Sequence, residues 1–78
     1  MSATILIAED ESLNRKNIAQ VLEDEGYIVY QAENGTDAID AVNKLDFDLV
    51  LSDYKMPGVD GLGILQHVRD VAPQTMFI

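Results

Sequence analysis

The chain has 78 residues and is 47% hydrophobic, which suits one small domain spanning residues 1–78 with a modest core. It has no cysteine, so a disulfide framework is excluded, and it shows neither a signal peptide nor an apolar run long enough to cross a bilayer. From these features we expect a cytoplasmic protein. Because 14 acidic residues outnumber 5 basic ones, the net charge of −9 disfavours direct binding to nucleic acid or anionic membranes.

The first half of the chain predicts two strands, each followed by a helix. Ile5–Ala8 is a continuous apolar run, as in a strand buried on both faces of a parallel sheet. Residues 11–26 predict a helix with Asp10 or Ser12 as its N-cap. Residues 27–32 predict a more polar edge strand, and residues 36–45 a second helix. The side chains expected to face inward are Leu13, Ile18, Val21 and Leu22 in the first helix and Ala38, Ile39, Ala41, Val42 and Leu45 in the second.

The second half of the chain continues the alternation. Phe47–Asp53 predicts a third strand, and Asp60 is expected to cap a third helix over residues 61–72. Thr75–Ile78 predicts a fourth strand. The inward side chains of the third helix are expected to be Leu62, Leu65 and Val68. Strands that alternate with helices predict an α/β fold with a doubly wound parallel sheet and helices on both faces.

Acidic residues follow two of these strands. Glu9 and Asp10 end the first strand and Asp53 ends the third, and a strand order of 2-1-3-4 makes those strands neighbours, ~4.8 Å apart. At ~5 Å and an effective dielectric of ~20, each pair of like charges costs roughly 3 kcal/mol, a sizeable part of the ~5–15 kcal/mol that stabilises a domain. We therefore expect a bound cation, and carboxylate ligands with room for water favour Mg²⁺.

The same residues also have simpler interpretations. Asp10 alone could be a helix cap and Asp53 alone could begin a turn, but neither accounts for both together. The single histidine, His67, lies mid-helix and is expected at the surface rather than in the cluster. A carboxylate beside Mg²⁺ can attack a phosphoryl group, and Asp53 is placed for that chemistry.

Two stretches, "ILIAEDE" (Ile5–Glu11) and "LVLSDYKMPGVDG" (Leu49–Gly61), resemble the receiver domain of bacterial two-component response regulators. The resemblance implies a flavodoxin-like (CheY-like) fold with strand order 2-1-3-4, and a signalling domain rather than a turnover enzyme. It implies that Asp53 accepts a phosphoryl group from a sensor histidine kinase or a phosphotransfer protein. The implied Mg²⁺ ligands are Asp10, Asp53, the backbone carbonyl of Lys55 and, through water, Glu9, which stands where aspartate is common.

The resemblance also implies that the receiver is truncated, because the segment expected to follow the fourth strand is missing from the sequence. A bare fourth strand would present an apolar edge that can pair with another chain. We therefore expect self-association, through Thr75–Ile78 at the sheet edge. The stretch "MPGVDGLGIL" (Met56–Leu65) also resembles receivers attached to transcription activators, in which a separate domain binds DNA.

Three other interpretations remain open at this stage. A dinucleotide-binding fold needs glycines where "AEDE" (residues 8–11) stands, and the glycines of Gly58–Gly63 have the wrong spacing. A phosphohydrolase with an aspartate nucleophile generally has a second aspartate two residues later, where this chain has Lys55. A receiver-like dimerisation module without phosphotransfer is the third alternative.

Overall fold

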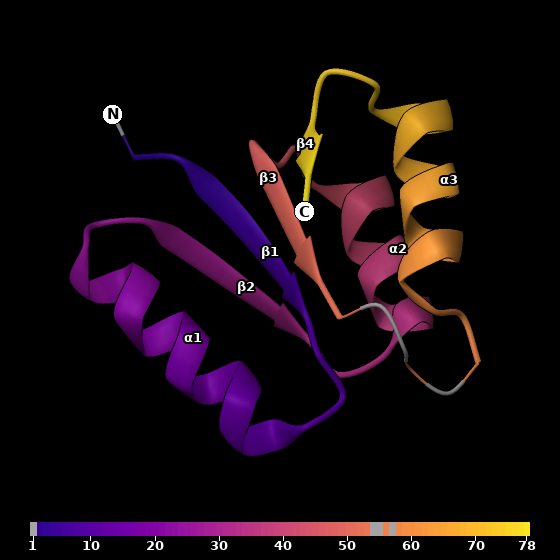
Figure 1. Cartoon of the computed structure of the whole chain (residues 1–78). Helices are drawn as coiled ribbons and strands as arrows, with labels where there is room; N and C mark the ends of the chain where they lie inside the picture. Colours follow the sequence, from indigo (N-terminus) through magenta and orange to yellow (C-terminus); the bar gives the residue numbers. More distant parts are fainter. Residues whose placement is uncertain (1, 54–55, 57) are drawn as a thin grey trace.

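The computed structural model describes residues 2–53, 56 and 58–78, and within them strands and helices alternate along the chain (Figure 1). The strands are β1 (Thr4–Ala8), β2 (Ile28–Ala32), β3 (Leu49–Ser52) and β4 (Met76–Phe77). The helices are α1 (Ser12–Asp24), α2 (Gly35–Lys44) and α3 (Gly61–Val71). The order of elements is the predicted one, although β2, β3 and β4 are each shorter than expected. None of the described helices is long and apolar enough to span a membrane.

The strands form one four-stranded parallel sheet in the order β2-β1-β3-β4. This order confirms the predicted 2-1-3-4 arrangement and makes the fold α/β and flavodoxin-like. Ala8 at the end of β1 pairs with Ala32 of β2 on one side and with Ser52 of β3 on the other. Because all strands are parallel, their carboxyl ends lie along the same edge of the sheet.

Helices cover the two faces of the sheet unequally: α1 lies against one face, and α2 and α3 lie against the other (Figure 1). Leu6 and Val50 point into the core beneath α2 and α3, whereas Ile5 and Ile7 point toward α1. Successive residues of a strand face opposite sides, so a strand covered on both faces is apolar throughout, as Ile5–Ala8 is.

The predicted N-cap of α1 and most of its predicted inward face are wrong. The N-cap is Glu11, not Asp10 or Ser12, and its side chain makes no capping hydrogen bond. Leu13, Ile18 and Val21 are exposed, whereas Leu22, as predicted, is half-buried beside the buried Ala19 and packs against β1. A small residue at position 19 lets the helix approach the strand closely, and this contact fixes which side of α1 faces the sheet.

The structures of α2 and α3 agree more closely with the predictions made from the sequence. Asn34 caps α2 by accepting from the amide of Asp37 (2.8 Å), and Asp60 caps α3, as predicted, by accepting from that of Gly63 (3.1 Å). Two predicted inward residues, Leu45 and Leu62, are exposed. Leu45 lies beyond the last helical residue of α2, so it leaves the helical stripe. In α3 the buried residues are Gly61, Ile64 and Val68, so the prediction is confirmed for Val68 and wrong for Leu62.

Candidate functional site

The ends of β1 and β3 are held at a fixed spacing by backbone hydrogen bonds. Beyond the last strand residues, the amide of Glu9 donates to the carbonyl of Ala32 (3.1 Å) and the amide of Asp53 donates to the carbonyl of Ala8 (2.9 Å). The hydrogen-bond ladders that join β1 to β2 and β3 to β1 therefore continue one residue past the ends of β1 and β3. The acidic residues begin where the sheet still fixes the backbone, which limits how far their side chains can separate.

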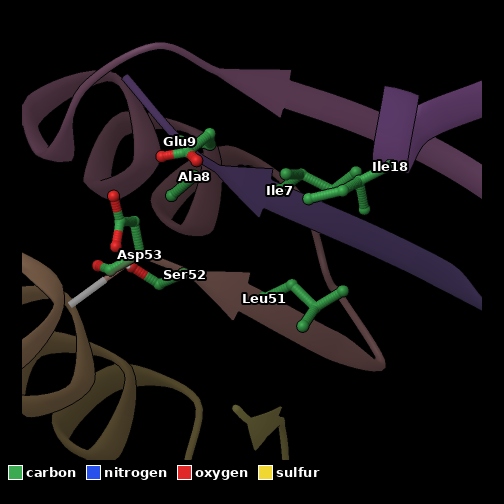
Figure 2. Close-up of a pocket in the computed structure, with 7 residues that line it drawn as sticks. All are labelled: Ile7, Ala8, Glu9, Ile18, Leu51, Ser52 and Asp53. Carbon is green, nitrogen blue, oxygen red and sulfur yellow. Dashed lines mark hydrogen bonds between the residues drawn. The ribbon is translucent and has the colours of Figure 1, made fainter. Parts of the chain in front are cut away.

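Three carboxylates converge at this edge. Glu9, Asp10 and Asp53 each have an oxygen within 4.8 Å of the others. Figure 2 shows the carboxylates of Glu9 and Asp53 at the same end of their two strands. The sequence predicted this convergence, and its origin is the β1–β3 pairing that brings together residues distant in the chain. Asp10 and Asp53 are exposed, whereas only 8% of Glu9 is exposed.

Glu9 has an unusual environment for a charged side chain. Its Oε1 accepts a hydrogen bond from Nδ2 of Asn14 at 3.2 Å. Its Oε2 is buried and has no partner among the described residues. Burial raises the pKa of Glu9, the hydrogen bond from Asn14 opposes that rise, and the nearby Asp53 and Asp10 carboxylates add to it. A carboxylate in this position gains from a nearby positive charge.

The first turn of α1 also holds the backbone of Glu9. The guanidinium Nη1 of Arg15 donates to the Glu9 carbonyl oxygen at 3.0 Å. Sequence reasoning did not single out Asn14 or Arg15. The available signal was their position, because the first turn of a helix that follows β1 must return over the end of that strand.

A hollow of about 160 Å³ adjoins the carboxylates (Figure 2). Glu9, Ser52 and Asp53 form its polar end, and Ile7, Leu51 and Ile18 form its apolar wall. Sites for drug-sized ligands are typically ~300–1,000 Å³, so this hollow suits an ion with water and a small anion better than a dinucleotide. Its size and its acidic end both argue against the dinucleotide-binding alternative.

The donor set fits Mg²⁺. Carboxylate oxygens are the ligands that this ion prefers, and the exposed positions of Asp10 and Asp53 leave room for the water that it retains. The predicted ligand at Lys55 lies outside the described residues. His67 lies away from the cluster, as expected, since its Nε2 is hydrogen-bonded to Oδ1 of Asn43 at 2.7 Å, between α3 and α2.

Val59, which precedes α3, lies against the start of α2. Gly35 lies so close to Val59 that a Cβ at position 35 would overlap the Val59 carbonyl oxygen. Val59 also contacts Gly63 at the start of α3. These two glycines thus allow Val59 to pack tightly against the starts of α2 and α3.

The family model for the response regulator receiver domain matches residues 5–78. The chain therefore belongs to the receiver domain family of two-component signalling. The sporulation initiation phosphotransferase F of Bacillus subtilis is 44% identical over 69 residues, which cover 88% of this chain and 56% of that protein. The chain thus spans little more than half the length of this relative.

Solved structures give the same family and fold. The response regulator TrrA of Thermotoga maritima, in complex with Mg(2+)-BeF, matches with a TM-score of 0.92 and 32% identity, covering 99% of this chain and 66% of that one. TrrA in complex with the histidine kinase ThkA matches with a TM-score of 0.89, 32% identity and the same coverage. The fold is therefore CheY-like, as the resemblance implied.

Proposed function

We propose that this domain accepts a phosphoryl group on Asp53 with the help of Mg²⁺. One observation carries the proposal: oxygens of three carboxylates lie within 4.8 Å of one another. A buried oxygen of Glu9 that has no partner among the described residues adds support. Such a cluster costs stability unless a cation neutralises it. Support for the choice of ion comes from TrrA, the similar regulator that was solved with Mg(2+)-BeF.

Each residue has a distinct part in the proposed chemistry. Asp10 and Asp53 would bind the metal directly, Glu9 through water, and Lys55 through its backbone carbonyl. When bound, the metal would neutralise the phosphoryl oxygens. Asp53 is exposed, so a partner can bring a phosphohistidine to it. A carboxylate oxygen of Asp53 then forms a bond to phosphorus as the phosphorus–nitrogen bond breaks, and the released imidazole nitrogen takes up a proton from solvent.

The partner in this proposal is a sensor histidine kinase or a phosphotransfer protein. The complex of TrrA with the kinase ThkA supports a kinase partner. The domain would act in the cytoplasm as a signalling acceptor, not as an enzyme that turns over substrate. Its net charge of −9 supports the proposal that the chain itself binds no nucleic acid.

Intact-mass spectrometry tests the proposal. Incubation with acetyl phosphate and Mg²⁺ should add one phosphoryl mass to the protein, and EDTA or the substitution Asp53→Asn should abolish it. Asp40→Asn, an exposed acid on α2, is the matched control and should be phosphorylated normally. Wild-type protein that gains no mass would favour the dimerisation module. Sustained release of phosphate over many turnovers would indicate the phosphohydrolase.

We also propose that this chain self-associates through Thr75–Ile78. Strand β4 lies at one edge of the described sheet, and Met76 and Ile78 are 64% and 65% exposed. An exposed apolar edge strand is a template for pairing with a second chain. Sedimentation velocity should show dimers or larger species that dissociate in Met76→Lys, because a charge on the edge opposes pairing. A stable, folded monomer at every concentration would contradict this proposal.

A further inference from the structure

Two consecutive residues of α1 hold Glu9 at two different points. Arg15 binds its backbone carbonyl at 3.0 Å, and Asn14 binds one carboxylate oxygen, Oε1, at 3.2 Å. The first contact fixes where the Glu9 side chain begins. The second fixes where that side chain ends, which is the feature that matters for a metal site.

The hydrogen bond from Asn14 reaches only one of the two oxygens of the Glu9 carboxylate. Oε1 is satisfied by the amide, so Oε2 is left buried and without a partner among the described residues. Both Asp10 and Asp53 have a carboxylate oxygen within 4.8 Å of a Glu9 oxygen. Oε2, the Glu9 oxygen that Asn14 leaves without a partner, is therefore the acceptor that Glu9 still has available in this cluster.

Glutamate needs such a contact more than aspartate does. Its side chain has one more rotatable bond, so a buried glutamate carboxylate has more orientations to lose when it is fixed. Asn14 is a suitable holder because its amide donates hydrogen bonds without bringing a positive charge that would compete with the metal. A lysine or arginine in its place would neutralise the site internally.

We propose that Asn14 is a positioning residue of the acidic site, which holds the Glu9 carboxylate so that its second oxygen is presented to the metal-bound water. The proposal rests on the proposed function, because it assumes that the cluster binds Mg²⁺. Asn14 itself touches neither the metal nor the phosphoryl group. It acts only through Glu9, and this restriction makes the proposal testable.

The first experiment measures Mg²⁺ affinity by calorimetry, together with the melting temperature in EDTA. Asn14→Ala should weaken Mg²⁺ binding about tenfold, the lower end of the effect seen when a ligand's hydrogen-bond partner is removed. Its melting temperature in EDTA should fall only modestly, because the higher helix propensity of alanine partly offsets the lost hydrogen bond to Glu9. Asn17→Ala, an exposed asparagine further along α1, should leave the affinity unchanged.

The second experiment separates positioning from a general structural role with a double-mutant cycle. In a Glu9→Ala background, Asn14→Ala should cause no further loss of Mg²⁺ affinity. An equal loss in both backgrounds, or no loss in the wild-type background, would overturn the role of Asn14 and leave the proposed function intact. The proposed function itself would be overturned if the wild-type protein bound no Mg²⁺, or if the Asp53→Ala variant bound Mg²⁺ as tightly as the wild type.

Discussion

The two faces of the sheet differ in how well they are covered. Beneath α2 and α3, Leu6, Val50 and Ile64 are completely buried. On the face of α1 the buried cluster is smaller, formed by Ile5, Ile7 and Ala19, and Met76, which pairs with Leu49 on this face, is 64% exposed. Yet α1, the helix of the less covered face, supplies Asn14 and Arg15, which hold Glu9. The comparison teaches that the larger part of the core lies on one face, while the orientation of the acidic site depends on the other.

The largest expected effect tests this inequality directly. Ile64→Ala should lower the free energy of unfolding by about 3 kcal/mol, because it leaves a cavity between α3 and the sheet. Val21→Ala on α1 should change it by less than about 0.5 kcal/mol, because Val21 is already in contact with solvent. Urea denaturation measures both. Equal losses would contradict the difference in packing between Ile64 of α3 and Val21 of α1.

A substitution at the start of α2 tests how tightly that face is packed. Gly35→Ala should destabilise the protein by about 1–3 kcal/mol, because the new methyl group would displace Val59. This is the reverse of the usual gain when alanine replaces glycine in a helix. Thermal unfolding gives the change, with Thr36→Ala as an exposed neighbour for comparison. An unchanged or higher melting temperature would refute the close approach of helix and loop.

The helix caps extend the comparison to the ends of the helices. Asn34→Ala and Asp60→Ala should each cost about 1 kcal/mol, since each removes a side-chain acceptor from the first turn of α2 or α3. Glu11→Ala should cost less than about 0.5 kcal/mol, because the Glu11 side chain makes no capping bond on α1. Chemical denaturation midpoints give the ranking. If Glu11→Ala lowered the free energy of unfolding as much as Asn34→Ala, the conclusion that α1 lacks a capping side chain would be contradicted.

The smallest effect concerns Glu9 and depends on pH. Burial raises the pKa of Glu9 above its ordinary value of 4.5, so the folded protein binds this proton more tightly than the unfolded chain. This contribution to stability is therefore present at low pH and is lost as the pH rises from 4.5 through the higher folded value. In metal-free buffer, Glu9→Gln should become more stable relative to wild type as the pH increases across that range.

The control for this titration is Glu33→Gln, which removes one negative charge from an exposed position. Subtracting its pH profile isolates the effect of burial at Glu9. A difference between Glu9→Gln and wild type that stays constant or shrinks with rising pH would contradict the prediction. If the site binds Mg²⁺, added Mg²⁺ should make the wild type more stable than Glu9→Gln, because a ligand that binds only the folded state stabilises that state.

The sequence was sufficient to predict the sheet and the convergence of the acids. Strand ends can be located from apolar runs such as Ile5–Ala8, and the parallel topology then brings Glu9 and Asp53 together. The orientation of α1 was not predictable in the same way. Apolar residues lie on more than one side of this helix, and periodicity does not reveal which side the sheet covers.

The contacts of Asn14 and Arg15 were missed for a related reason. Successive residues of an α-helix are ~100° apart around its axis, so the direction of a side chain depends on exactly where the helix begins and how it is rotated. The start of α1 lies after Glu11, not after Asp10 as one predicted cap required. The buried state of Glu9 follows from these contacts and was equally inaccessible from the sequence.

The central position of β1 also has a consequence for the order of folding. This strand pairs with β2, which follows soon after it, and with β3, which is much more distant in the chain. Pairings between distant segments carry a larger loop-closure entropy and tend to form late. Glu9 and Asp53 therefore become neighbours only when the third strand has docked, so a partly synthesised chain that ends before β3 cannot form the acidic site.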